Sequence, residues 1–166
     1  MSTDRIEKKI LLHAPLERVW QAVSDSAQFG YWFGIAFEGQ FIPGKRVAGK
    51  ISMTKVDPEV AKLQQPHLGK QVDFWVERVD PLRSISFRWH PHAVSPDADY
   101  SKEPTTLIEF MLQTIGDDTQ LTITESGFDQ IPLERRAAAM QANDGGWSHQ
   151  MKLIEKYLAM QPARVG

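Results

Sequence analysis

Glu125 is the residue whose type and position most suggest chemistry. It follows Leu121 and Ile123 at alternate positions of an expected strand, so its side chain shares the face that these apolar residues bury. A carboxylate desolvated in this way is a candidate general acid or base. The alternative is structural, with a glutamate at a strand end that pairs with Arg136, Gln150 or solvent. Because an unpaired buried carboxylate is costly, we expect at least one polar contact from Glu125 to the C-terminal helix or to a water in the cavity. Arg136, Asn143 and Gln150 are the partners within reach if that helix crosses over the strand. Glu125 is therefore the only catalytic candidate, and we favour a protein that is not an enzyme.

A second group of side chains is suited to binding. Most are aromatic residues or methionines on expected inward faces, and Asn143 and Gln150 lie among them on the C-terminal segment. Together they are typical of a largely apolar site in which a few polar groups orient the ligand. The alternative is that most of the aromatic side chains simply pack together as core. The expected ligand-binding residues are Trp32, Phe37, Trp75, Phe87, Trp89, Phe110, Glu125, Met140, Asn143, Trp147, Gln150 and Met151.

Other patterns that suggest chemistry are weak. The segment His90-Pro91-His92 looks like a pair of metal ligands, but Pro91 breaks the strand period and no third ligand follows at a recognisable spacing. Ser126 lacks the elbow motif of a hydrolase nucleophile. Gly145-Gly146 lies inside a helical pattern and not after a strand, so it is not a phosphate-binding loop. We expect no metal and no cofactor.

The elements that must position these residues follow from periodicity. Period-two alternation predicts a strand at 6–12 and a clearer one at 84–90, where Ile85, Phe87 and Trp89 share one face. Two short helices are expected between Pro15 and Gly30, and a further strand at 32–41. The long polar segments 54–69 and 91–104 are expected loops, the first containing a helical turn, and their roles stay open. In order, the sequence predicts a strand, one or two helices, six antiparallel strands and a final helix, which makes an α+β domain covering residues 1–166.

The C-terminal segment predicts one amphipathic helix from about Pro132 to Met160. Trp147, Met151, Ile154 and Leu158 are spaced by four, three and four residues, which places them on one buried face. Gly145-Gly146 weakens this helix by roughly 1 kcal/mol per glycine relative to alanine. We expect a kink there, or a close approach of the helix to the sheet.

Composition excludes several classes of protein. The 166 residues carry a net charge of −2, so the electrostatic footprint of a nucleic-acid-binding protein is missing. No cysteine occurs, which excludes disulfides and thiol chemistry and fits a reducing compartment. No stretch approaches the roughly 20 apolar residues that span a bilayer, and the N-terminus lacks a signal-peptide pattern. We therefore expect a cytoplasmic protein.

Several short motifs carry a resemblance. They are Ala14-Pro15 with Val19-Trp20, then Trp32, then 85–89 (ISFRW), 124–128 (TESGF) and Gly146-Trp147, and they span Arg5 to about Leu158. In this order the chain resembles the START-like (SRPBCC) superfamily and, within it, the branch named after the activator of heat-shock-protein ATPase (AHSA-like). The resemblance implies a helix-grip fold with an internal cavity. In that fold a curved antiparallel β-sheet wraps around a long C-terminal helix, with two short helices after the first strand.

The resemblance implies no single activity, because the superfamily includes lipid carriers, hormone receptors, polyketide cyclases and co-chaperone domains. We expect binding of a small hydrophobic molecule in a cavity between the sheet and the C-terminal helix. One alternative is a cyclase or dehydratase that acts on a bound polyketide-like substrate through Glu125. The other is an interaction protein that modulates a chaperone ATPase through its surface. A homodimer and a chaperone partner stay open.

Overall fold

Two short helices follow the first strand, and a helix of 28 residues ends the part of the chain that is described. The computed structural model describes residues 5–90 and 104–160. In chain order the elements are strand β1 (Arg5–Leu12), helices α1 (Leu16–Ser24) and α2 (Ser26–Phe33), strands β2 (Ile35–Phe37), β3 (Arg46–Val47) and β4 (Gly49–Ile51), helix α3 (Pro58–Gln64), the 3₁₀ turn η1 (Gln65–His67), strands β5 (Phe74–Asp80), β6 (Ser84–Trp89), β7 (Thr106–Ile115) and β8 (Asp118–Ser126), the 3₁₀ turn η2 (Phe128–Gln130) and helix α4 (Leu133–Met160).

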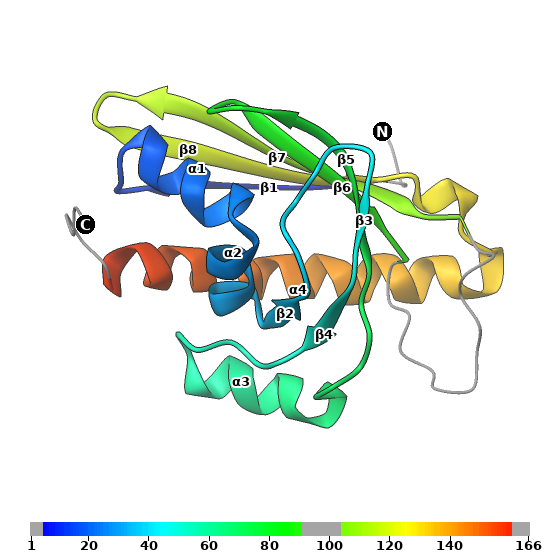
Figure 1. Ribbon diagram of the computed structural model, residues 1–166. Coiled ribbons are helices and arrows are strands. Elements are labelled where there is room, and N and C mark those ends of the chain that lie inside the picture. Colours follow the sequence, from blue (N-terminus) through cyan, green and yellow to red (C-terminus); the bar gives the residue numbers. More distant parts are fainter. Residues whose placement is uncertain (1–4, 91–103, 161–166) are drawn as a thin grey trace.

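The strands form one large antiparallel sheet and one small one. The large sheet has the order β1-β8-β7-β6-β5-β3, and β2 pairs separately with β4. The large sheet lies along one side of α4, and α3 lies on the other (Figure 1). Helices α1 and α2 lie beside the C-terminal half of α4 (Figure 1). This arrangement confirms the α+β helix-grip fold predicted from the sequence.

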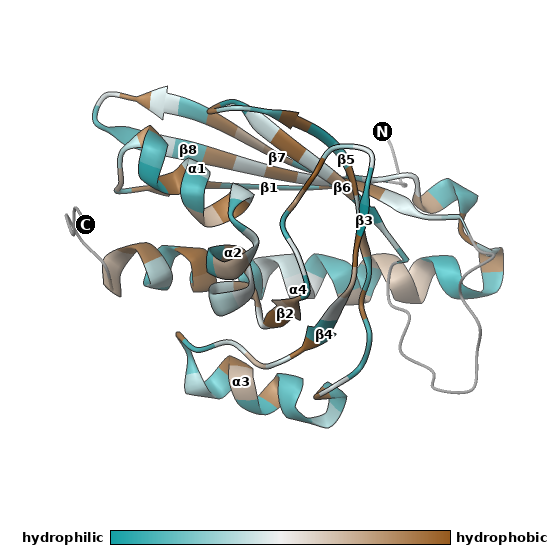
Figure 2. Ribbon diagram, viewed as in Figure 1, coloured by the Kyte–Doolittle hydropathy of each residue, from teal (hydrophilic) through white to brown (hydrophobic). Residues whose placement is uncertain are grey.

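Alternation along the strands builds the inner face of the large sheet. Ile85 and Phe87 on β6 are at most 1% exposed, as the period-two pattern predicts. Their neighbours across β7 are Phe110 and Ile108, which are also buried. Hydrophobic and hydrophilic residues alternate visibly along these strands (Figure 2). Because the inner face is apolar, a polar residue that shares it must find partners there.

An aromatic cluster fills the space between this face and the short helices. Phe29 of α2 is fully buried at its centre. Its ring centroid lies between 4.9 and 6.0 Å from those of Trp32, Phe33, Phe37, Phe41, Phe74, Phe87 and Phe110. The rings meet mostly edge to face, the arrangement that aromatic pairs prefer. Much of the aromatic content is therefore core.

Helix α4 buries the face that its spacing predicts. Trp147 is 2% exposed, and Met151, Ile154 and Leu158 are buried with it. The helix runs through Gly145 and Gly146 without a break. A Cβ atom added at either glycine would meet no atom within 4 Å, so the predicted close approach to the sheet is wrong.

Two further predictions about elements need correction. The expected strand at 32–41 is only three residues long, because Trp32 and Phe33 belong to α2. Packing of Trp32 decides this, since its buried indole N–H donates to the carbonyl of Ala22 at 2.9 Å. Gly34 then ends the helix with a φ of 99°, a conformation that suits glycine. The expected loop 54–69 contains α3 and η1, and of the expected loop 91–104 only residue 104 is described.

Candidate functional site

The side chain of Glu125 is fully buried near the end of β8. Its partners across the sheet are Ile6 on β1 and Ile108 on β7, and both are buried. Burying a carboxylate among apolar residues costs several kcal/mol or more unless hydrogen-bond donors compensate. The surroundings of Glu125 must therefore supply donors.

Within residues 5–90 and 104–160, four side chains donate hydrogen bonds to Glu125. Its Oε2 accepts from the indole Nε1 of Trp89 at 2.7 Å and from Oγ1 of Thr106 at 2.5 Å. Its Oε1 accepts from the indole Nε1 of Trp147 at 2.8 Å. The amide Nδ2 of Asn143 lies 3.0 Å from both oxygens. A carboxylate offers roughly four acceptor sites, so these donors use its capacity.

The donors come from different layers of the fold. Trp89 ends β6, Thr106 begins β7, and Asn143 and Trp147 lie one turn apart on α4. Glu125 therefore joins the sheet to the long helix through hydrogen bonds inside an apolar interior. Hydrogen bonds to a charged acceptor are stronger than those between neutral groups. The network fixes where α4 lies over the sheet.

The sequence predicted a polar contact between Glu125 and the C-terminal helix, and Asn143 confirms it. The other two side chains expected within reach of Glu125 make hydrogen bonds elsewhere. Arg136 donates instead to the carbonyl oxygens of Asp129 and Ile131, and Gln150 donates to that of Phe33. Sequence reasoning placed Trp89 and Trp147 on inward faces but did not identify their N–H groups as donors to Glu125. It also did not name Thr106 as a partner of Glu125. The available signal was two inward tryptophans, whose buried N–H groups need an acceptor.

A pocket of about 320 Å³ lies next to this network. It is bounded by α4, by the end of α2 with β2, and by α3 with η1. Its lining residues are Phe33, Gly34, Ile35, Ile51, Val60, Leu63, Gln64, His67, Val72, Trp89, Ala142, Asn143, Gly146, Trp147, His149 and Gln150. Leu63 is 61% exposed, so the pocket opens to solvent along α3. Three donors to Glu125 form part of the wall, while Glu125 itself lies behind them.

Two glutamine amides fix the wall where α2 ends. The Nε2 atom of Gln64 donates to the carbonyl oxygen of Phe33 at 3.0 Å, and that of Gln150 donates to the same oxygen at 3.3 Å. The Oε1 atom of Gln64 accepts from the backbone N–H of Thr54 at 2.6 Å. Residues from α2, α3 and α4 thus meet at one carbonyl group.

The expected ligand-binding residues divide into two groups. Trp89, Asn143, Trp147 and Gln150 line the pocket. The other expected residues do not line it. Part of this group belongs to the core or packs against it, namely Trp32, Phe37, Phe87, Phe110, Met140 and Met151. Trp75 makes an edge-to-face contact with His90, and Glu125 lies behind the pocket wall. The pocket lies toward α3 and is not centred under the sheet.

Sequence reasoning missed the α3 wall. Val60, Leu63, Gln64 and His67 line the pocket from a segment expected to be a polar loop of open role. The only signal was length, since long loops are often functional. The amphipathic character of α3 is hard to see because the helix has only 7 residues and buries none of them.

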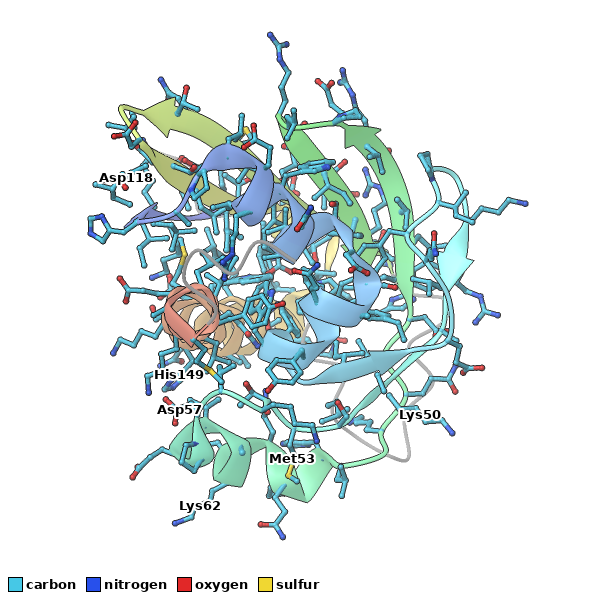
Figure 3. All side chains as sticks on the ribbon, turned by 60° about the vertical axis from the view of Figure 1, so that its left-hand side comes forward. Lys50, Met53, Asp57, Lys62, Asp118 and His149 are labelled. Atoms are coloured by element: carbon cyan, nitrogen blue, oxygen red, sulfur yellow. The ribbon has the colours of Figure 1, made fainter. Side chains whose placement is uncertain are left out.

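An ion pair anchors this wall to α4. Asp57 caps α3 by accepting from the backbone N–H groups of Glu59 and Val60. Its Oδ2 also accepts from Nζ of Lys156 on α4 at 2.5 Å. The hydrogen bond from Lys156, followed by those from the backbone, lowers the pKa of Asp57. The labelled Asp57 and His149 lie on the side of the molecule where α3 faces α4 (Figure 3).

Neither metal ligands nor a membrane helix appear in the described part of the chain. Residues 5–90 and 104–160 contain no group of three or more His, Asp or Glu side chains that could hold a metal ion. His92 of the suspected pair lies outside the described residues. Over the same residues, no helix is long and apolar enough to cross a membrane.

Comparison with known families matches residues 13–159 to the model of the activator of Hsp90 ATPase homolog 1-like proteins. The chain belongs to this family. The match covers nearly the whole chain and confirms the AHSA-like, START-like resemblance seen in its motifs. Among curated proteins, no sequence matches this chain.

Several solved structures of low sequence identity share the fold of this chain. Protein MLL2253 from Mesorhizobium loti is 20% identical, with a TM-score of 0.68 over 95% of this chain and 98% of that one. The Aha1 dimer from Colwellia psychrerythraea is 17% identical, with a TM-score of 0.63 over 93% of this chain and 95% of that one. DynU16, from the dynemicin biosynthetic locus, is 21% identical, with a TM-score of 0.66 over 95% of this chain. The chain spans only 48% of DynU16.

Proposed function

We propose that this protein binds a small, largely apolar molecule in the pocket between α4 and α3. The supporting observation is the pocket itself, with Trp89 and Trp147 held in its wall by a buried carboxylate. Its volume of about 320 Å³ is at the lower end of the range for small-molecule sites, roughly 300–1,000 Å³. A ligand of two or three fused rings, or a short acyl chain, suits this size.

The same geometry gives Glu125 a positioning role. A general acid or base must lie within hydrogen-bond reach of the substrate atom that it serves. Glu125 is not among the lining residues, and Trp89, Thr106, Asn143 and Trp147 occupy its oxygens. Proton transfer to a ligand would require breaking this network. The arrangement therefore favours binding over the cyclase or dehydratase alternative.

Two adjacent glycines allow a matched test. Gly146 lines the pocket and Gly145 does not, yet a Cβ atom at either position meets nothing within 4 Å. Leucine is also a better helix former than glycine by roughly 0.8 kcal/mol. We expect Gly146→Leu to fill the pocket without unfolding the protein, and Gly145→Leu to leave the pocket open.

The measurement is fluorescence titration with N-phenyl-1-naphthylamine, an apolar probe that brightens when it leaves water. The unaltered protein and Gly145→Leu should show the same saturable binding, and Gly146→Leu should bind at least tenfold more weakly. Thermal denaturation of all three proteins checks that they are folded. No saturable binding to the unaltered protein, or equal binding to both variants, would overturn the proposal.

The remaining proposals rest on the comparisons and on composition. A chaperone partner is suggested by the family's name, and a homodimer by the relative from Colwellia psychrerythraea, which was solved as a dimer. A cytoplasmic location rests on the cysteine-free composition. Light scattering on the purified protein tests for the dimer.

A further inference from the structure

Within the described residues, only the nitrogen of the Gln150 side-chain amide has a hydrogen-bond partner. Its Nε2 donates to the carbonyl oxygen of Phe33 at 3.3 Å, and this contact fixes which way the amide points. Its Oε1 is buried, and no residue in the described part of the chain donates to it. Gln150 also lines the pocket. A buried acceptor without a donor costs roughly 1–3 kcal/mol, so its presence at a binding site calls for an explanation.

Asn143 offers the pocket the same kind of atom. Its Nδ2 is committed to Glu125, which leaves its carbonyl oxygen as the polar atom that it can turn to a ligand. Seven residues separate Asn143 from Gln150, so both lie on one face of α4, roughly 10 Å apart along the axis. Gln64, the third amide of the wall, has both ends occupied by Phe33 and Thr54. The free ends of the two amides on α4 are therefore acceptors, and they lie beside the imidazole of His149, which also lines the pocket.

We propose that the pocket selects apolar molecules that carry a hydrogen-bond donor, a hydroxyl or N–H group, and that Gln150 Oε1 accepts this bond. The inference rests on the proposed function, since it names the ligand class of the same pocket. A donor on the ligand satisfies the buried oxygen, whereas an ether or a carboxylate places a second acceptor against it. A free fatty acid or aromatic acid is thus a poor ligand, and an alcohol or phenol is a good one.

The test compares three naphthalene probes of nearly the same shape: 2-naphthol, 2-methoxynaphthalene and 2-naphthoate. Each displaces N-phenyl-1-naphthylamine from the unaltered protein, from Gln150→Leu and from Gln141→Leu. Gln141 is exposed on α4 outside the pocket, so it receives the same substitution without touching the site. Because each preference is compared between proteins, the different solubilities of the probes cancel.

We expect the preference for 2-naphthol over 2-methoxynaphthalene to be about three- to tenfold larger in the unaltered protein and in Gln141→Leu than in Gln150→Leu, the worth of one neutral hydrogen bond. The preference for 2-naphthol over 2-naphthoate should likewise be smaller in Gln150→Leu than in the unaltered protein. Gln150→Met, which is unbranched like glutamine, replaces the leucine variant if that variant melts early.

The outcomes separate the two proposals. If Gln150→Leu keeps the same relative affinities for the three probes as the unaltered protein, the inference about Gln150 fails while the binding function stands. If neither the probes nor N-phenyl-1-naphthylamine binds the unaltered protein, the binding function fails and the inference with it.

Discussion

The ring centroids of Trp89 on β6 and Trp147 on α4 lie 5.8 Å apart, and the two indole N–H groups donate to different oxygens of Glu125. One buried carboxylate therefore sets the spacing between the sheet and the long helix at the point where both contribute to the pocket wall. A neutral apolar residue at position 125 would leave both indole N–H groups buried without an acceptor. Glu125 is thus buried behind the pocket wall and positions the two tryptophans that line it.

The first prediction concerns Glu125→Gln. The amide keeps the shape of the side chain but replaces one acceptor oxygen by an NH₂ group, which then faces donors. We expect the free energy of unfolding to fall by roughly 1–3 kcal/mol, measured by urea denaturation. Binding of N-phenyl-1-naphthylamine should weaken as well, since Trp89 or Trp147 loses its anchor.

Glu155→Gln is the matched control, because Glu155 is exposed on α4 outside the pocket. It should change the free energy of unfolding by less than about 0.5 kcal/mol. If Glu125→Gln changes the free energy of unfolding as little as this control does, the hydrogen bonds to Glu125 do not stabilise the pocket wall.

The second prediction isolates a single donor. Trp147→Phe keeps an aromatic ring against Phe33 and Phe110 but removes the N–H that donates to Glu125. We expect a loss of roughly 1–3 kcal/mol in the free energy of unfolding, part of it from the smaller ring. In the background of Glu125→Gln the same substitution should cost less, because the two residues share one interaction. Strict additivity of the two losses would show that the hydrogen bond carries no stability.

The third prediction tests the straight course of α4. Gly145→Ala and Gly146→Ala should each stabilise the protein by roughly 1 kcal/mol, or about 2–4 °C in Tm, because alanine favours the helix and its Cβ meets open space. Gly49→Ala on β4 provides the contrast. Its Cβ would lie 2.7 Å from Cγ2 of Ile35 and 2.9 Å from the carbonyl oxygen of Val72, so it should lower the Tm. A fall in Tm for the α4 variants would indicate a need for glycine that the packing does not show.

Much of the fold could be predicted because it depends on strong local periodicity. The alternation that places Ile85 and Phe87 on one face, and the spacing of Trp147 and Met151, both matched buried residues. Trp32 could not be assigned correctly, because its place in α2 depends on a hydrogen bond to the carbonyl of Ala22, ten residues earlier. Propensity alone favours a strand for such an aromatic run.

The site was less accessible from sequence than the fold. The inward phase of Glu125 predicted its burial, and proximity to the C-terminal helix predicted Asn143 as a partner. The pocket itself depends on α3, which follows the small β2–β4 sheet in the chain and lines the pocket together with α4. No local pattern reports such a long-range contact, so the aromatic side chains could not be divided into core and lining from sequence.

The fourth prediction uses the ion pair that holds α3 against α4. The hydrogen bond from Lys156, with those from the N–H groups of Val60 and Glu59, keeps the pKa of Asp57 below its ordinary value of 3.8. Because the folded-state pKa is lowered, the ionised carboxylate stabilises the folded protein above the unfolded-state pKa, and this contribution is lost as the pH falls through the folded-state pKa. At neutral pH the anchor is therefore complete.

Asp57→Asn separates the charge from the helix cap, since asparagine caps helices about as well as aspartate but does not attract the ammonium of Lys156. We expect this variant to be less stable than the unaltered protein at pH 7, with a difference that shrinks as the pH falls below 3.8 and as salt screens the pair. Urea denaturation midpoints from pH 7 to pH 3 measure it. Lys156→Met should show the same pH profile, because it removes the other half of the pair. A difference that stays constant over this range would mean that Asp57 acts only as a cap, and that α3 is held to α4 by the Gln64 and Gln150 amides instead.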